Sequence, residues 1–348
     1  MKSKKIVNLT IDKFIDFSLY DKKLGYYMKK NPFGKKGDFI TAPNISRLFS
    51  EMVAIWIISF WKSLGAPKKL NLIELGAGNG EMMEIIIESL KNFPNFFSSC
   101  NLVIHEKSPT LIKIQKKKLC KNKINWISNL KELKRYPSIF IANEFFDSLS
   151  IKQFIKKKGT WFERYVHLEK SNNFFFIDKR FDIKKYEKKL KLNISQNQNF
   201  IEFSETGLKY LRNISSMIKK NSGGLLIFDY GYLEKKMKNT LQAINNHKFS
   251  NILEDIGNSD ITHNINFHML KKIVNQISDL DCDITIQRDF LLRMGIKERA
   301  EIISRNKSFL EKTDIYYRLN RLINKSQMGS LFKVMLIKNK KNKHKLGF

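Results

Sequence analysis

A glycine-rich loop, Glu74-Leu-Gly-Ala-Gly-Asn-Gly80, joins an apolar segment to a helix-forming one, and this junction limits the possible folds most strongly. The apolar run 70–75 before it is typical of a buried strand, and 81–91 after it has helical periodicity. Glycines at such a junction allow a tight turn and a close approach of the backbone to a ligand. We therefore expect a Rossmann-like α/β fold, with the ligand bound at the carboxyl ends of the strands.

Further strand-like segments alternate with helical ones, which predicts a mostly parallel, doubly wound sheet. The predicted strands that follow the loop are 101–105, 124–127, 138–143, 224–231, 284–288 and 331–337. Between the fourth and fifth strands of the sheet, residues 153–181 contain three strand-like runs separated by polar turns. These runs predict an antiparallel β-meander inserted into the α/β domain.

The same patterns divide the chain into three parts. Residues 1–66 are expected to form an N-terminal helical region, with helices over 8–30 and from Asn44 onward, and a loop that covers the ligand. Residues 67–338 are expected to form the α/β domain, with the meander at about 151–182. A basic tail, 339–348, is expected to be disordered.

The spacing of the loop favours S-adenosylmethionine (SAM) over a dinucleotide. A dinucleotide fingerprint is G-x-G-x-x-G, whereas Gly76, Gly78 and Gly80 follow an acid, Glu74, in the pattern acid-x-G-x-G-x-G. A pyrophosphate is disfavoured beside a carboxylate, but the ammonium and sulfonium of SAM are cations. The sequence therefore predicts that these four residues bind SAM, although a glycine loop alone is also compatible with a plain tight turn.

Two later strand ends carry polar residues that belong to the same crevice. Glu106 ends the second strand, where an acid can accept both ribose hydroxyls of a nucleoside. Asn143 and Glu144 end the fourth strand, beside the point where the strand order reverses. We expect Glu106 and Asn143 to contact the cofactor.

The composition predicts the cellular compartment of the protein but leaves its binding partner open. The chain of 348 residues has a formal net charge of +31, which fits either a polyanionic partner or a general compositional bias toward lysine. Its three cysteines match no zinc or redox spacing, and no apolar run is long enough to span a bilayer. With no targeting segment recognised, the sequence predicts a cytoplasmic protein without a metal site, whose oligomeric state stays open.

Several segments together resemble the MidA-type methyltransferases, relatives of the complex I assembly factor that methylates arginine. The resemblance runs in order from about residue 25 to 335, and departs from the family pattern at Asn44, Ser50, Ala77, His263 and Asn266. The segments that carry it are Gly25-Tyr-Tyr, Gly37-Asp-Phe-Ile-Thr-Ala-Pro43, the glycine loop, Glu106-Lys-Ser-Pro109, Ala142-Asn-Glu-Phe-Phe-Asp147, Trp161-Phe-Glu-Arg164, Asp229-Tyr-Gly231, Asp260-Ile-Thr262 and Met328-Gly-Ser-Leu-Phe-Lys333.

The resemblance implies a class I SAM-dependent methyltransferase that dimethylates arginine on a protein, the 49-kDa-type subunit of respiratory complex I, in support of complex I assembly. A guanidinium beside a sulfonium needs carboxylates to orient it and to accept a proton, and Glu144 and Asp147 are the expected catalytic pair. Further expected residues are Gly37, Asp38, Phe39 and Ser108 at the cofactor and Asp229 and Tyr230 at the substrate.

Two other functions stay open from the sequence. The high positive charge fits an RNA or DNA methyltransferase, although the Asn-Pro-Pro-Tyr/Phe motif common among nucleic-acid amino methyltransferases is absent. The departures at Asn44 and Ser50 also fit a SAM-binding assembly chaperone with little catalytic activity.

Overall fold

A computed structural model describes residues 7–29, 41–169, 173–245, 248–254 and 256–348. Its centre is a sheet in the order β15-β16-β10-β5-β2-β3-β4, in which β16 runs antiparallel to both of its neighbours and β4, β3, β2, β5 and β10 run parallel. The strands are β2 (Leu70–Leu75), β3 (Cys100–His105), β4 (Asn125–Ile127), β5 (Ser138–Asn143), β10 (Gly223–Tyr232), β15 (Leu280–Ile286) and β16 (Phe332–Asn339); β14 (Ile265–Asn266) adds to the end of β10. The predicted doubly wound α/β sheet is confirmed.

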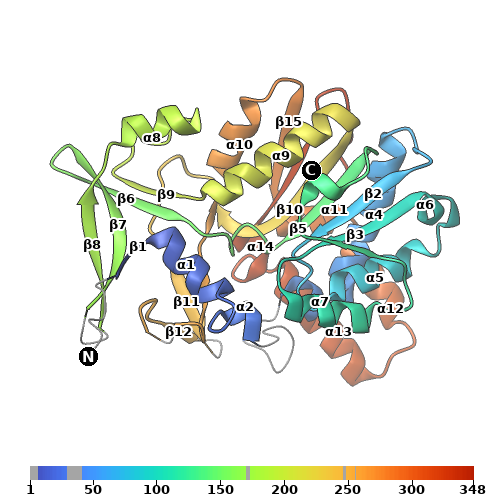
Figure 1. The fold of residues 1–348 in the computed structure, drawn as a ribbon. Coiled ribbons are helices and arrows are strands. Elements are labelled where there is room, and N and C mark those ends of the chain that lie inside the picture. Colours follow the sequence, from blue (N-terminus) through green and yellow to red (C-terminus); the bar gives the residue numbers. More distant parts are fainter. Residues whose placement is uncertain (1–6, 30–40, 170–172, 246–247, 255) are drawn as a thin grey trace.

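Helices cover both faces of this sheet (Figure 1), because its strands send alternate side chains to opposite faces. Leu72 packs into one buried cluster and Ile73 into the other. The helices of the α/β unit are α4 (Arg47–Ser63), α5 (Glu81–Leu90), α6 (Pro94–Ser99), α7 (Pro109–Lys118), α9 (Glu205–Asn221), α10 (Phe267–Asn275), α11 (Gln287–Arg293), α12 (Ile296–Ser304), α13 (Phe309–Ile323) and α14 (Met328–Leu331), with a 3-10 turn, η1 (Leu130–Glu132).

The predicted meander is present as a separate antiparallel sheet, in the order β1-β7-β6-β9 with β8 also paired to β7. Its strands are β1 (Val7–Thr10), β6 (Lys152–Lys157), β7 (Thr160–Leu168), β8 (Phe174–Arg180) and β9 (Phe200–Phe203). The helix α8 (Ile183–Leu190) lies between β8 and β9 in the chain. In Figure 1 this sheet extends away from the central sheet. The inserted part of this sheet starts with β6, directly after the loop that follows β5.

The N-terminal region differs from the single helix predicted over 8–30. Residues 7–10 pair with β7, and the helical part is split into α1 (Ile11–Tyr20) and α2 (Tyr26–Lys29). The split follows from Asp21, whose carboxylate accepts hydrogen bonds from the amides of Lys23 and Leu24 and so replaces the helical pattern. A small sheet of β11 (Gln242–Asn245), β12 (Lys248–Ser250) and β13 (Asp260–Thr262) shares a buried cluster with α1.

Two other local expectations were wrong. The second helix is capped by Ser46, after a short α3 (Ala42–Ile45), rather than by Asn44. The strand expected to end at Arg288 ends at Ile286, where α11 begins.

The basic tail also differs from the expected disordered segment. Trp56 donates from its indole nitrogen to the carbonyl of Leu346 at 3.2 Å, and the ring of Phe348 lies 5.7 Å from that of Phe290. These contacts fix the end of the chain because they bury an aromatic side chain and satisfy a buried donor.

Candidate active site

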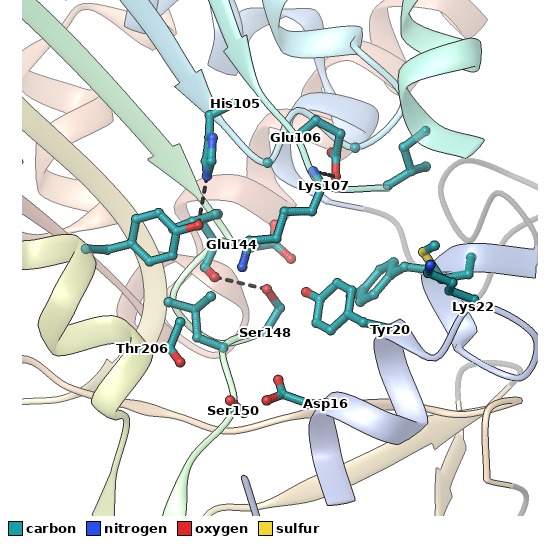
Figure 2. A pocket seen from close by; sticks show the side chains of 18 residues that line it. Asp16, Tyr20, Lys22, His105, Glu106, Lys107, Glu144, Ser148, Ser150 and Thr206 are labelled. Atoms are coloured by element: carbon teal, nitrogen blue, oxygen red, sulfur yellow. Dashed lines mark hydrogen bonds between the residues drawn. The ribbon is translucent and has the colours of Figure 1, made fainter. Parts of the chain in front are cut away.

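A cavity of about 420 Å³ opens at the carboxyl ends of β2, β3 and β5 (Figure 2). This is the edge at which parallel α/β sheets bind ligands, and the volume is that of a site for a small molecule. Its walls come from the glycine loop, the ends of β3 and β5 with the segments that follow them, and the helices α1, α2, α7 and α9. The lining residues are Asp16, Tyr20, Lys22, Tyr27, Met28, Gly76, Gly78, His105, Glu106, Lys107, Leu111, Glu144, Phe145, Ser148, Leu149, Ser150, Thr206 and Tyr210.

The glycine loop adopts a conformation that favours glycine. Gly76, Gly78 and Gly80 have φ angles of 65°, 53° and 81°. A β-carbon on Gly76 would lie 2.9 Å from a ring carbon of Phe145, so the loop also has no space for a side chain there. The amide of Gly76 donates to the carbonyl of His105 at 2.9 Å, and this bond ties the loop to the end of β3. Gly76 and Gly78 line the cavity, whereas Gly80 lies outside it at the start of α5.

A second, smaller cavity lies beside the same loop and shares Gly76, Gly78 and Glu144 with the first. Within it, one carboxylate oxygen of Glu74 and the amide oxygen of Asn143 are buried and accept no hydrogen bond from any described residue. Burial raises the pKa of Glu74 to about 8, and the nearby charge of Glu106 adds to the shift. Two buried acceptors without donors favour a cationic or hydrogen-bond-donating ligand.

Glu106 lines the large cavity from the end of β3. Its carboxylate accepts hydrogen bonds from the amides of Lys107 and Ser108 at 2.8 and 2.9 Å and from the side chain of Gln115 at 3.2 Å. Burial raises its pKa. These donors hold the carboxylate in place at the position where the sequence predicts a ribose contact.

The loop after β5 carries Glu144 and Asp147. Glu144 has a φ of 49°, a strained value for a residue other than glycine, and its amide donates to the carbonyl of Phe228 at 2.9 Å. Burial raises the pKa of Glu144 to about 8, and the charge of Asp147 adds to the shift. Burial also raises the pKa of Asp147, which accepts a hydrogen bond from the hydroxyl of Tyr230. Glu144 lines both cavities, whereas Asp147 lines neither.

Asp229 on β10 is hydrogen-bonded to the loop that carries Glu144 and Asp147. It has no exposed surface, and its carboxylate accepts hydrogen bonds from the amides of Phe146 and Asp147 at 3.0 and 3.3 Å. Burial, together with the charges of Asp147 and Glu144, raises its pKa. Asp229 and Tyr230 line neither cavity, and both are hydrogen-bonded to the loop that carries Glu144 and Asp147. Their predicted contact with the substrate stays a prediction.

Aromatic rings form much of the remaining wall. Tyr20 and Tyr27 stack with their ring centroids 5.6 Å apart, and the side chain of His105 is hydrogen-bonded to the hydroxyl of Tyr210 at 2.8 Å. Burial lowers the pKa of His105 to about 4, so its ring is neutral near pH 7. Aromatic faces beside Glu106 and Glu144 suit a cation, because the face of a ring carries partial negative charge.

The remaining predicted residues fall outside the cavities or outside the described structure. Ser108 is fully buried, caps α7 by accepting from the amide of Leu111 at 3.2 Å, and donates to the carbonyl of Tyr27 at 2.7 Å. The predicted cofactor residues Gly37, Asp38 and Phe39 lie outside the described residues.

Sequence reasoning missed several cavity residues, notably Asp16, Tyr20, Lys107 and Tyr210. Asp16 and Tyr20 are four residues apart on one face of α1, and this spacing is visible in the sequence. Nothing in the local pattern indicates that α1 packs across the end of the central sheet.

Taken together, the sheet order, the glycine loop and the acid-lined crevice define a class I SAM-dependent methyltransferase. The residues present fit the cofactor: Glu74 and Asn143 offer buried acceptors for a cation, and Glu106 stands at the nucleoside position. Residues 52–286 match the family described as "Putative S-adenosyl-L-methionine-dependent methyltransferase". The chain belongs to this family, and S-adenosyl-L-methionine is its cofactor.

Relatives and solved structures agree with this assignment. The chain is 27% identical to "Protein arginine methyltransferase NDUFAF7, mitochondrial" of Xenopus laevis, over 93% of this chain and 80% of that protein. It is 26% identical to the Homo sapiens protein of the same name, over 93% and 78%. A crystal structure from Burkholderia thailandensis, bound to S-adenosyl-homocysteine, superposes with a TM-score of 0.83 at 21% identity, covering 98% of this chain and 90% of that one.

These relatives correct one expectation from the sequence. The proteins of Xenopus laevis and Homo sapiens are named as mitochondrial, which overturns the prediction of a cytoplasmic protein. That prediction rested on the failure to recognise a targeting segment, and such a failure is weak grounds for a compartment. No helix in the described parts of the chain has the length and apolar character needed to cross a membrane.

Proposed function

We propose that this enzyme methylates arginine on a protein substrate. The observation that carries the proposal is the half-buried Glu144, which faces an aromatic-lined cavity and forms no ion pair among the described residues. A carboxylate in this position suits a guanidinium, which presents paired N–H donors. The similar proteins of Xenopus laevis and Homo sapiens, both named as protein arginine methyltransferases, support the same chemistry.

In the reaction, bound SAM supplies a methyl group on a positively charged sulfur. Glu144 accepts hydrogen bonds from the guanidinium and turns one nitrogen toward the glycine loop. A new N–C bond forms as the S–C bond breaks, its electron pair returns to sulfur, and the proton released by the nitrogen passes to the Glu144 carboxylate. The raised pKa of Glu144 makes the side chain a better proton acceptor than an ordinary glutamate.

Asp147 and Asp229 have positioning roles in this proposal. Asp229 holds the amides of Phe146 and Asp147, and Tyr230 holds the Asp147 carboxylate, so the strained loop keeps Glu144 at the cavity. The expected catalytic role of Asp147 thereby becomes an electrostatic one, since its negative charge raises the pKa of Glu144. Residues 1–66 contribute Asp16, Tyr20 and Tyr27 to the wall of the large cavity. This supports the proposal that they form a region that covers the ligand beside the 67–338 domain.

We further propose a subunit of respiratory complex I as the substrate, on the resemblance of the motifs to the MidA-type family. The test incubates the purified protein with methyl-labelled SAM and the purified 49-kDa-type subunit, followed by mass spectrometry of its peptides. Methylarginine in the subunit is the expected result. SAM binding without methyl transfer to that subunit or to arginine peptides would contradict arginine methylation and favour a SAM-binding chaperone.

A further inference from the structure

The large cavity has an acidic group at its rim that the proposed chemistry does not use. Asp16 is exposed, lies on α1, and points toward the cavity between Ser150 and Tyr20 (Figure 2). Within the described ranges it forms no ion pair, and the surrounding protein raises the pKa of its carboxyl by desolvation. An acid at this point is therefore available to a ligand that enters the cavity.

The order of the side chains indicates a path of entry. Tyr20 lies one helical turn beyond Asp16 on the same face of α1, and its ring is half-buried. Glu144, opposite α1 in Figure 2, reaches the glycine loop. A side chain that reaches Glu144 past α1 would therefore pass Tyr20 and leave its neighbouring residues close to Asp16.

α1 is a rigid support for this group. Ile11, Phe14, Ile15 and Leu19 are all buried in one cluster with Val166 and Ile261, so the opposite face of the helix is fixed. Asp12, one turn before Asp16, is committed to an ion pair with Lys152 at 3.1 Å and lines no cavity. Of these two acids, Asp16 is the one that faces the cavity.

We propose that Asp16 is a specificity-determining residue that binds a lysine or arginine side chain flanking the target arginine. The inference rests on the proposed function, because it takes the entering group to be an arginine on a peptide. A carboxylate at the rim that interacts with Ser150 but forms no ion pair among the described residues favours a cationic neighbour and disfavours an acidic one. Lys107 and Lys22 also line the cavity and disfavour a second cation near them. The positive charge of Lys107 partly offsets the rise in the pKa of Asp16, which favours the ionised carboxylate.

The experiment uses the full chain saturated with S-adenosyl-homocysteine and two fluorescent peptides with one central arginine. One peptide has a lysine two residues away, and the other has alanine there. Wild-type protein is expected to bind the lysine peptide about fivefold more tightly, the effect of roughly 1 kcal/mol for a partly exposed ion pair. Asp16→Asn is expected to remove this preference, and Asp16→Lys to reverse it toward a glutamate-flanked peptide.

Asp12→Asn is the matched control, because it removes the same charge one turn away and is expected to keep the preference. An equal loss in both variants, or an unchanged preference in Asp16→Asn, would overturn the inference. Methylation of the same peptides with SAM is measured in parallel. A binding preference that depends on Asp16 without any methyl transfer would contradict the proposed function and leave the role of Asp16 standing.

Discussion

Glu51 on α4 is buried and Glu144 in the crevice is half-buried, and the pKa values of the two carboxyl groups are shifted in opposite directions. Glu51 accepts hydrogen bonds from Arg47 at 2.9 Å and from Arg299 at 2.7 Å. Burial opposes its ionisation, yet these two arginines lower its pKa overall. No arginine or lysine forms an ion pair with Glu144 in the described structure, and burial raises its pKa to about 8.

This difference indicates that Glu51 stabilises the fold, whereas Glu144 is placed to bind a ligand. Glu51 has its cations built into the chain, so its charge holds α4 to α12. Glu144 and Glu74 keep acceptor groups at cavities without an internal cation, which is unfavourable until a positive group arrives. SAM and a guanidinium are both positive, and the crevice is suited to receive them together.

The largest expected effect is the difference in kcat between variants of Glu144 and Glu51. Glu144→Gln removes the proton acceptor and one charged partner of the guanidinium, so kcat should fall by about 10² to 10⁴-fold. Glu51→Gln, the control, should keep kcat within about threefold, because its side chain lines no cavity. Initial rates with labelled SAM and an arginine peptide give both values. Undiminished methylation by Glu144→Gln would remove Glu144 from the catalytic role.

The next largest effect concerns the glycine loop. Gly76→Val places a branched side chain at a φ of 65° and against Phe145, so SAM affinity should fall by roughly 10- to 100-fold, for a strain of about 1–3 kcal/mol. Gly65→Val is the matched control: its φ is 83°, but no atom lies within 4 Å of its β-carbon. Calorimetric titration of SAM into both variants separates a local effect from a general backbone cost. Equal affinities in the two variants would argue against cofactor binding at Gly76.

A third prediction compares stability. Glu51→Gln should lower the free energy of unfolding by about 1 kcal/mol, since its arginine partners are partly exposed and the ion pairs are screened. Glu144→Gln should leave the free energy of unfolding unchanged or raise it at pH 8, because it removes a charge that burial disfavours. Urea unfolding of the ligand-free protein measures both. A marked loss of stability in Glu144→Gln would mean that the charge of the carboxylate stabilises the fold.

A fourth prediction concerns the pH dependence of stability. Between pH 4.5 and about 8, the folded protein keeps protons on Glu74 and Glu144 that the unfolded chain has lost. Because the folded state binds more protons, stability should fall as pH rises through this window. The double variant Glu74→Gln/Glu144→Gln should show a flatter profile than the wild type in thermal unfolding without ligand. Parallel profiles would show that neither pKa is raised.

The sequence was most informative where a function depends on local spacing. The acid-x-G-x-G-x-G pattern and the strand before it are local, and Glu74, Gly76, Gly78, Glu106 and Glu144 do lie at the cavities. Asp16 and Tyr20 were missed because their position depends on how α1 packs against β13 and Val166, a contact between distant segments. Ser108 and Asp229 were predicted at the cofactor and the substrate, and both lie outside the two cavities and hydrogen-bond backbone groups. Such bonds join distant segments of the chain, so the local sequence does not show them.

The central claim is that Glu74 and Glu144 bind cationic ligands. Its most direct test is the number of protons released when SAM binds at pH 7. A cation placed beside Glu74 and Glu144 should lower their pKa values and release protons into the buffer. Calorimetry in buffers of different ionisation enthalpy should show net proton release in the wild type and less in Glu74→Gln. Binding of SAM without proton release, or with equal release in Glu74→Gln, would contradict the assignment of these acids to the cationic ligands.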